Sequence, residues 1–485
     1  MKVRKFIIPA LVGLALFTGS CSKNEVVDPV DGGTTPTGNV VEVTGDIKTA
    51  TTWKADKIYL LKGFVFVTDG AELTIEPGTI IKGDKATKGT LIVTRGSKIN
   101  AVGTAEQPIV FTSNLGAGAR REGDWGGIII LGKAPVNQGT DVKIEGGLTP
   151  TGNGDEKKYI SYGGTDAADN SGKLKYVRIE FGGISFSPDN EINGLTLGGV
   201  GSGTEIDYVQ VYRSGDDSFE FFGGTVNAKH LLAIGSWDDD FDTDFGYSGK
   251  IQFALSQRYP TVADISGSNG FESDNDGSGS DKTPQTSAVF SNVTILGPLK
   301  SGSKLSDVNQ NFQHAVQIRR NSAISAYNSV FVGYTEGVYI DASKVTTPKS
   351  TIENYLQGRL GFANNLVLGA NIKGNEVKGD NADNKALFET ALRTANTFDA
   401  SLLADAVMTD PYKYASDFKN PGTPNFTVKT GSAAASGAKF TDAKVADAFF
   451  EKVDYRGAFG TTDWSAGWAN FDPQTLPYDA PGKVK

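Results

Sequence analysis

Cysteine, histidine and methionine are nearly missing from this chain, which has one, two and two of them in 485 residues. The lone cysteine, Cys21, excludes any disulfide within the chain. Two histidines, His230 and His314, cannot form the Cys/His clusters that hold zinc and other soft metals. A metal site in this protein would therefore have to use oxygen ligands.

Motifs for several common chemistries are missing as well. The sequence has no Gly-x-Ser-x-Gly nucleophile turn, no phosphate-binding loop and no dinucleotide-binding fingerprint. The net charge of −9 excludes nucleic acid as a default partner, because binding to nucleic acid needs basic patches. The acidic residues are therefore the more promising place to look for a site.

No apolar run is long enough to cross a membrane as a helix, and residues 6–17 form only a short run after a basic start. This run leads to Thr18-Gly-Ser-Cys21, which looks like a bacterial lipobox. We therefore expect residues 1–20 to be a lipoprotein signal peptide and Cys21 to be the acylated N-terminus of the mature protein. Residues 21–45, rich in Asp, Pro, Gly and Thr, are expected to form a flexible, lipid-anchored tether.

An acylated Cys21 also predicts a location. Fatty acyl chains such as palmitate on Cys21 would attach the protein to the membrane through this lipid anchor. The polar residues after the cysteine, Ser22, Lys23 and Asn24, are compatible with sorting to the outer membrane. We expect the folded part to lie at the cell outer membrane and to be exposed on the cell surface.

The 60 glycines, with frequent valine, isoleucine, threonine and phenylalanine, predict many short strands joined by tight turns. Strand-like segments of four or five residues recur between residues 63 and 112, each closed by glycine or a polar turn. Three such strands per coil of 22 to 30 residues indicate a right-handed, single-stranded parallel β-helix, which we predict for residues 46–348. A β-sandwich or a propeller is the competing interpretation, although propeller blades repeat at about 40 residues or more.

Residues 349–485 have a different pattern and are predicted to form a helix-bearing segment that packs on the β-helix or caps it. Apolar residues at helical spacing place one helix in residues 383–405, and a second is expected in residues 441–453. Trp464 and Trp468 could form a ligand platform, but packing of the cap is the favoured role.

A repeated acidic motif carries the functional argument. Asp216-Asp-Ser-Phe-Glu220 aligns with Asp238-Asp-Asp-Phe-Asp242 at a spacing of 22, and Gly270-Phe-Glu-Ser-Asp274 repeats the Phe–acid step 30 residues later. On successive coils, the side chains stacked inside would be Phe219, Phe241 and Phe271. The side chains stacked outside would be Glu220, Asp242 and Glu272, with a second outward column of Phe222, Asp244 and Asp274.

Carboxylates stacked about 4.8 Å apart repel by roughly 3 to 4 kcal/mol at an effective dielectric constant near 20. Three solutions remain open: a hard cation, above all Ca²⁺; raised carboxyl pKa values in a catalytic site; or neutralisation by Arg319 between Asp274 and Asp341. The candidate cation ligands come from the columns and their turns: Asp216, Asp217, Glu220, Asp238, Asp239, Asp240, Asp242, Asp244, Glu272, Asp274 and Asp276.

Four motifs resemble a known family: Asp124-Trp-Gly-Gly127, Tyr176-Val-Arg-Ile-Glu180, residues 215–230, and Tyr455-Arg-Gly-Ala-Phe-Gly460 with Trp464. They are similar to bacterial cell-envelope lipoproteins with a pectin-lyase-like β-helix, a family without an assigned activity. The resemblance implies the fold and the location but transfers no catalytic residue.

Polysaccharide lyases with this fold bind Ca²⁺ through stacked acids and need a basic side chain on the same face. The candidate catalytic residues here are Arg319, Arg320, Lys229 and Glu272.

These patterns support three functions. The favoured one is a surface-anchored lipoprotein that binds a polysaccharide or a partner protein of the outer membrane along one β-helix face, with Ca²⁺ on the acidic column. The second is a Ca²⁺-dependent polysaccharide lyase or hydrolase. The third is a structural or adhesive envelope protein without a small ligand.

Overall fold

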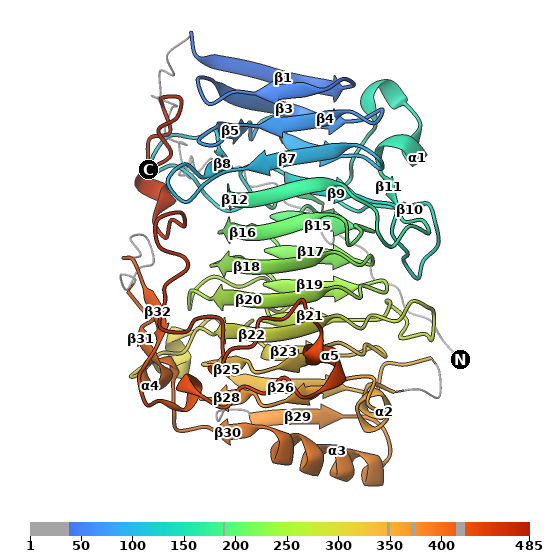
Figure 1. Ribbon diagram of the computed structural model, residues 1–485, viewed down its shortest axis with the longest axis vertical. Coiled ribbons are helices and arrows are strands. Elements are labelled where there is room, and N and C mark those ends of the chain that lie inside the picture. Colours follow the sequence, from blue (N-terminus) through green and yellow to red (C-terminus); the bar gives the residue numbers. More distant parts are fainter. Residues whose placement is uncertain (1–37, 188–189, 347–349, 370–373, 414–421) are drawn as a thin grey trace, which may run out of the picture.

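The computed structural model describes residues 38–187, 190–346, 350–369, 374–413 and 422–485. The predicted signal peptide, Cys21 and most of the predicted tether lie outside these residues. Most strands join one 26-stranded sheet that winds into a right-handed parallel β-helix, so the predicted fold class is confirmed (Figure 1). Within the described ranges, none of the helices is both long and apolar enough to cross a membrane.

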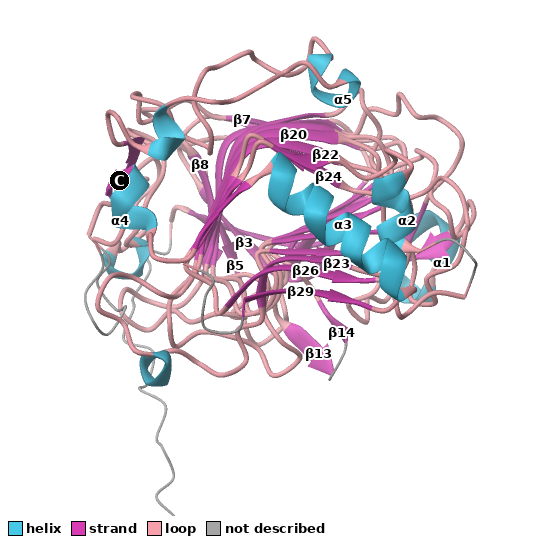
Figure 2. Cartoon of the chain, turned by 90° about the horizontal axis from the view of Figure 1, so that it is seen from below, coloured by secondary structure: helices cyan, strands magenta, loops and turns pink. Residues whose placement is uncertain are grey.

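Each coil has three faces, which are seen along the axis in Figure 2. The first face consists of β6 (Thr90–Val93), β9 (Gly127–Leu131), β15 (Leu195–Gly198), β17 (Phe219–Phe222), β19 (Phe241–Asp244), β21 (Phe271–Ser273), β23 (His314–Ile318), β26 (Glu336–Asp341) and β29 (Gly374–Lys378). Long bent strands give their first half to the second face and their second half to the third: β12 (Gly172–Glu180), β16 (Glu205–Tyr212), β18 (Asn227–Ile234), β20 (Lys250–Gln257) and β22 (Val289–Leu296).

Shorter strands complete the coils. The second face also contains β2 (Thr51–Trp53), β4 (Glu72–Ile75), β7 (Lys98–Val102), β24 (Ser325–Tyr327) and β27 (Phe362–Ala363). The third face also contains β5 (Ile80–Gly83), β8 (Ile109–Ser113), β25 (Val330–Val332), β28 (Leu366–Leu368) and β30 (Thr397–Asp399). In the first coils, β1 (Val40–Ile47) and β3 (Ile58–Val67) bend from the third face to the first.

Aromatic residues mark the bend between the second and third faces. Tyr176, Tyr208, His230 and Phe253 have φ angles of 50°, 54°, 50° and 59°, in the left-handed region that bulky residues rarely adopt. Their rings stack from coil to coil, with centroids 4.5, 4.2 and 5.3 Å apart. His230 Nδ1 lies 2.7 Å from Asp207 Oδ1. His230 is therefore a structural residue of this corner.

The interior of the coils is filled by the inward residues of every strand. Phe219, Phe241 and Phe271 are fully buried and follow one another on successive coils, with ring centroids 5.5 and 5.7 Å apart. Burial of one such ring contributes about 1.5 to 3 kcal/mol. Because side chains alternate along a strand, this stack fixes which neighbouring residues point outward. The predicted phenylalanine column is thus confirmed.

Both predicted ends of the β-helix need correction. β1 begins at Val40 and pairs with β3, so the end of the predicted tether (residues 40–45) already belongs to the sheet. At the other end, β28 and β30 continue the third face beyond residue 348. Strand β28 lies between helices α2 (Thr351–Leu356) and α3 (Ala382–Ala395), and β30 follows α3. The helical spacing of this region predicts the helices but not these short strands.

Helix α3 covers the last coil (Figures 1 and 2). Its buried Phe388 and Leu392 belong to the same core cluster as the coil interior, whereas Leu387 on its other side is 61% exposed. The side chain of Asn381 caps α3 by accepting a hydrogen bond from Asn384 N. The helix confirms part of the prediction for residues 383–405. The second predicted helix is reduced to the four residues of α5 (Ala443–Ala446).

The remaining C-terminal chain does not cap the end but returns along the side of the coils (Figure 1). It reaches the early coils, where Arg120 Nη1 donates to Leu476 O at 2.8 Å and Arg178 Nη2 donates to the Tyr478 hydroxyl at 3.1 Å. We call residues 422–485 the side segment. Its Trp468 is buried and packs edge-on against Tyr208, which confirms packing as the role of this tryptophan.

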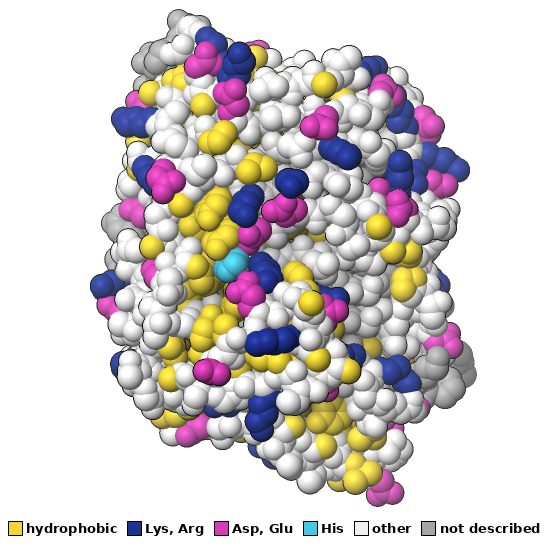
Figure 3. All heavy atoms as spheres, viewed as in Figure 1, with side chains coloured by type: hydrophobic (Ala, Val, Ile, Leu, Met, Phe, Trp, Pro, Cys, Tyr) yellow, Lys and Arg dark blue, Asp and Glu magenta, His cyan; other side chains and the backbone are white. Residues whose placement is uncertain are grey.

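Among the described residues, further short elements outside the coils include the antiparallel pairs β10 (Val142–Lys143) with β11 (Ser161–Tyr162), β13 (Ser185–Ser187) with β14 (Asn190–Glu191) and β31 (Met408–Asp410) with β32 (Asn425–Val428), and the helices α1 (Glu156–Tyr159) and α4 (Ala404–Val407). The side seen in Figure 1 carries mixed acidic and basic side chains around a band of hydrophobic ones (Figure 3). Ion pairs there, such as Lys173 Nζ to Glu205 Oε2 at 2.9 Å, contribute about 0 to 1 kcal/mol each. The charge on that side is therefore balanced.

Candidate functional site

A groove of about 1040 Å³ lies along the outer side of the first face, over strands β17 to β26 and the turns that precede them. Its cationic or titratable basic side chains are those of His314, Arg319 and Lys344. Its carboxylates are far more numerous: Glu145, Glu191, Asp216, Asp217, Glu220, Asp238, Asp239, Asp242, Asp264, Glu272, Glu336 and Asp341. The groove is thus strongly acidic.

The outward column in this groove has the predicted register. Glu220 lies beside Asp242, and Asp242 lies beside Glu272, on adjacent strands. Gln317 and Tyr339 continue the column on the next two coils. The second column also begins as predicted, with Phe222 beside Asp244. Consecutive coils therefore aim three carboxylates in one direction, as the spacing of the repeats requires.

A further column lies in the turns before these strands, from which candidate cation ligands were also predicted. It lies three residues before the outward column, and each side chain binds the backbone of the next coil. Asp217 Oδ1 accepts a hydrogen bond from Asp239 N at 2.7 Å, and Asp239 Oδ1 accepts one from Asn269 N. Asn269 Oδ1 accepts one from His314 N at 3.0 Å. In Asp217 and Asp239, one carboxylate oxygen thus holds the backbone of the next coil.

Two overlapping groups of carboxylates occupy the upper half of the groove. Asp216, Asp217 and Asp238 each offer one oxygen within 4.8 Å of the others, and so do Asp217, Glu220 and Asp242. Asp217 and Glu220 are only 7% and 6% exposed. The side chains of Asp216 and Asp242 make no hydrogen bond or ion pair with any part of the chain that the structure describes. We call Asp216, Asp217, Glu220, Asp238 and Asp242 the upper cluster.

The electrostatic state of the upper cluster follows from burial and mutual repulsion. Loss of solvent, and then the charges of the neighbouring acids, raise the pKa of Asp216, Asp217, Glu220 and Asp242 well above its usual range. Burial also raises the pKa of Asp238 to about 7, although a hydrogen bond from Ser266 opposes the shift. These carboxylates therefore need either protons or a positive ion.

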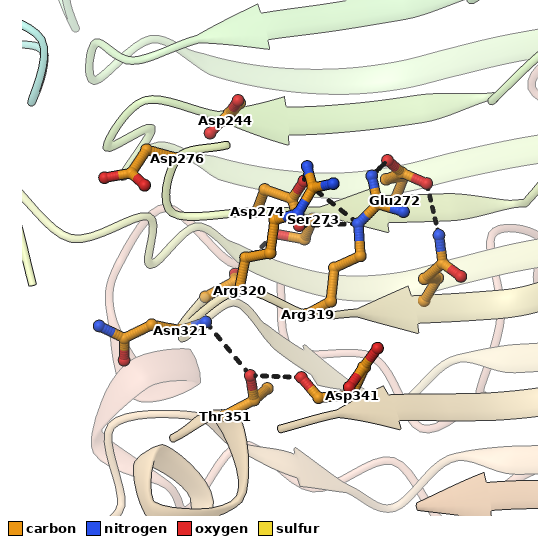
Figure 4. Close-up of polar contacts among 12 residues, drawn as sticks. Asp244, Glu272, Ser273, Asp274, Asp276, Arg319, Arg320, Asn321, Asp341 and Thr351 are labelled. Atoms are coloured by element: carbon orange, nitrogen blue, oxygen red, sulfur yellow. Dashed lines mark hydrogen bonds and ion pairs between the residues drawn. The ribbon is translucent and has the colours of Figure 1, made fainter. Parts of the chain in front are cut away.

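In the lower half of the groove, arginine supplies the positive charge (Figure 4). Arg319 Nε lies 2.9 Å from Asp274 Oδ1, and its Nη2 pairs with Glu272. Arg320 Nη1 lies 2.6 Å from Asp274 Oδ2. Burial alone would lower the pKa of Arg319, but Glu272 and Asp274 outweigh burial and raise it. The prediction that Arg319 also pairs with Asp341 is wrong. Asp341 instead accepts a hydrogen bond from Ser343 N at 2.8 Å.

Six predicted site residues do not line the groove: Lys229, Asp240, Asp244, Asp274, Asp276 and Arg320. Asp240 is fully buried and pairs with Arg258 at 2.9 Å, because its side chain turns inward at the corner before β19. Asp276 accepts a hydrogen bond from Ser278 N at 2.9 Å, as a turn residue. Asp244 accepts one from Phe245 N at 2.6 Å. Lys229 lies on the second face and pairs with Glu451 of the side segment at 2.7 Å, so it cannot act on the acidic column.

Several groove residues come from segments that the repeats did not connect with the site. Glu145 lies in the loop before β11, and its carboxyl is hydrogen-bonded to Glu220 and Asn193. At the lower end, His314 Nε2 lies 2.8 Å from Glu336 Oε2, and its ring stacks on Tyr339 at 4.3 Å. The sequence signal for His314 was its place in the turn column, three residues before Gln317.

The donor set of the upper cluster fits a hard cation. All its ligand atoms are carboxylate oxygens, they lie within a few ångströms of one another, and the turn column holds Asp217 in place. Ca²⁺ takes six to eight oxygen ligands and favours such carboxylates. The lower half does not fit a cation, because Arg319 and Arg320 already occupy its carboxylates.

Comparison with curated proteins finds no match for this chain. A family model described as a pectate-lyase-like beta helix domain matches residues 45–402, which include all coils from the second half of β1 to β30. The matched region contains the whole groove and its acidic columns. The chain therefore belongs to the pectate-lyase-like β-helix domain family.

Proposed function

We propose that this protein binds an extended glycan in the groove of its first face and that Ca²⁺ bound by the upper cluster supports this binding. The observation that carries the proposal is the asymmetry of the groove. Arginine pairs with the lower carboxylates, whereas the side chains of Asp216 and Asp242 in the upper half have no hydrogen-bond or ion-pair partner in the described ranges. A divalent cation would remove the repulsion within the upper cluster and could also contact acidic groups of a ligand.

The shape of the groove supports an extended ligand. The groove crosses several consecutive coils, from Asp216 before β17 to Asp341 at the end of β26. Membership of the pectate-lyase-like family supports a carbohydrate-related or cell-surface role in general. We further propose that a lipid on Cys21 holds the protein at the outer membrane, exposed on the cell surface, where long polysaccharides or a partner protein would reach the groove.

Binding to glycans can be tested directly. Purified protein without its first 37 residues would be applied to immobilised polyuronides and neutral glucans, with Ca²⁺ or with EDTA. We expect binding to at least one glycan in Ca²⁺ and at least tenfold weaker binding in EDTA. Equal binding in both buffers would remove the cation from the proposal. A lack of binding to every glycan would favour a partner protein or an adhesive role.

A Ca²⁺-dependent lyase or hydrolase is the second candidate. The raised pKa of the upper carboxyls favours a hydrolase, because a carboxyl that keeps its proton near neutral pH, and so does not ligate the cation, can act as a general acid in glycoside hydrolysis. Arg319 is poorly suited to be the base of a lyase, because Glu272 and Asp274 hold it as a cation. Ultraviolet absorbance of unsaturated products and a reducing-sugar assay would separate the two reactions. A Glu272→Gln variant as active as wild type would exclude Glu272 from either.

A further inference from the structure

Trp237 differs from the other tryptophans of this chain in its exposure. Trp53, Trp125 and Trp468 are buried, and Trp464 is partly buried in a stack with Phe459 at 4.4 Å. The side chain of Trp237 is 43% exposed and lines the groove. A large aromatic ring at a groove wall gives apolar contact area at little cost in conformational entropy.

The backbone of Trp237 is held firmly although its ring is exposed. Its N–H donates to Ser214 O at 3.0 Å. Its carbonyl accepts hydrogen bonds from Arg258 Nη2 at 3.0 Å, from Ser268 Oγ at 2.6 Å and from Asp264 N at 3.0 Å. Arg258 is itself fully buried and paired with Asp240. This network fixes the position from which the ring enters the groove.

A second exposed apolar side chain lines the same groove as Trp237. Asp264 N bonds to the Trp237 carbonyl, and the next residue, Ile265, is 90% exposed and also lines the groove. Trp237 directly precedes Asp238 of the upper cluster. The groove therefore places apolar side chains next to the upper cluster, so a ligand there meets an apolar surface and an acidic one at adjacent positions.

We infer that Trp237, together with Ile265, forms a stacking subsite for the apolar face of a pyranose ring, adjacent to the upper cluster. The inference rests on the proposed glycan binding and specifies the part of the glycan that is recognised, which is the apolar face of one sugar ring. Sugar rings present C–H groups on their faces and hydroxyl or carboxylate groups at their edges. A ring stacked on Trp237 would keep its polar edge toward Asp238 and its neighbours, which is the arrangement of the groove wall. Binding sites for small molecules commonly pair aromatic walls with a few polar groups in this way.

The test compares wild type with Trp237→Ala and Trp237→Phe, using polygalacturonate, alginate and cellohexaose as probes. A Leu387→Ala variant, which removes an exposed apolar side chain of α3 far from the groove, serves as control. We expect Trp237→Ala to weaken the binding of the tightest probe by about tenfold or more and Trp237→Phe to weaken it less. Calorimetric titration with Ca²⁺ alone should give the same stoichiometry in all four proteins.

Tryptophan fluorescence gives an independent readout, because the other four tryptophans are shielded by the fold. The bound probe should change the emission of wild type and protect it from acrylamide quenching, and Trp237→Phe should lose both effects. Wild-type affinity in Trp237→Ala, with binding still lost in EDTA, would overturn the subsite and leave the proposed function intact. If wild type binds none of the probes, the glycan proposal fails and the subsite fails with it.

Discussion

At the scale of single residues, carboxylates of the groove and of the strand ends directly beside it occupy two opposite electrostatic settings. Asp274 shares its oxygens between Arg319 and Arg320. Asp242, which points into the upper half, is surrounded by other acids and makes no ion pair with a described residue. Loss of charge removes an attraction in the first setting and a repulsion in the second. The same chemical change should therefore have opposite effects at the two positions.

Asp242→Asn should stabilise the Ca²⁺-free protein. The substitution keeps the shape of the side chain and removes one negative charge from between Glu220 and Glu272. We expect the free energy of unfolding in EDTA to rise by about 1 to 2 kcal/mol. Urea unfolding followed by circular dichroism measures this change. A decrease in stability would show that Asp242 has a favourable partner in the cation-free protein.

Asp274→Asn is the matched control, with the expected effect reversed. The substitution leaves Arg319 and Arg320 without the carboxylate that joins them. We expect the free energy of unfolding to fall by about 2 to 3 kcal/mol, because the partly buried Arg320 loses its carboxylate partner and Arg319 keeps only Glu272. The same urea experiment applies. Equal changes at Asp242 and Asp274 would mean that arginine does not divide the groove into two halves.

At the scale of elements, helix α3 protects the open end of the β-helix. Its Phe388 and Leu392 are inserted into the coil core, while Leu387 faces solvent. Phe388→Ala should lower the free energy of unfolding by about 3 kcal/mol or more, since it opens a cavity under the last coil. The free energy of unfolding of Leu387→Ala should stay within about 0.5 kcal/mol of the wild-type value. In hydrogen-exchange measurements, the backbone amides of β28 and β30 should exchange faster in Phe388→Ala but not in Leu387→Ala. Equal protection of these strands in the two variants would contradict this role of α3.

The elements also show what the sequence could predict. The spacing of Phe219, Phe241 and Phe271 was sufficient for the register, because an inward stack of large rings determines which neighbours face outward. Turn residues were less predictable: Asp240 turns inward because Arg258, from the third face, offers it a buried partner. Glu145 reaches the groove from a loop, where no repeat exists to reveal its position.

At the scale of the whole molecule, the unpaired acids make stability depend on pH. The upper carboxyls have a raised pKa in the folded state, so the folded protein holds more protons than the unfolded one. Stability of the Ca²⁺-free protein should therefore fall as pH rises from the ordinary carboxyl range through about 7, the pKa of Asp238. Thermal unfolding in EDTA at pH 5, 6 and 8 should show a decreasing midpoint. A midpoint that rises with pH would indicate that the acids are stabilised as anions.

Bound Ca²⁺ should compensate for the loss of stability at high pH. A bound cation favours the ionised carboxylates and so supplies at pH 8 the stabilisation that protons supply at pH 5. The gain in thermal midpoint on adding Ca²⁺ should be largest at pH 8 and small at pH 5. An equal gain at both pH values would point to cation binding away from the upper cluster.

The most direct measurement is a calorimetric titration of EDTA-treated protein with Ca²⁺ at pH 8, for wild type and for Asp242→Asn. If the upper cluster holds the cation, wild type will show saturable binding with a raised thermal midpoint, and Asp242→Asn will bind Ca²⁺ at least tenfold more weakly. An absence of heat and of any thermal shift in wild type would contradict the central claim, and so would unchanged affinity in Asp242→Asn.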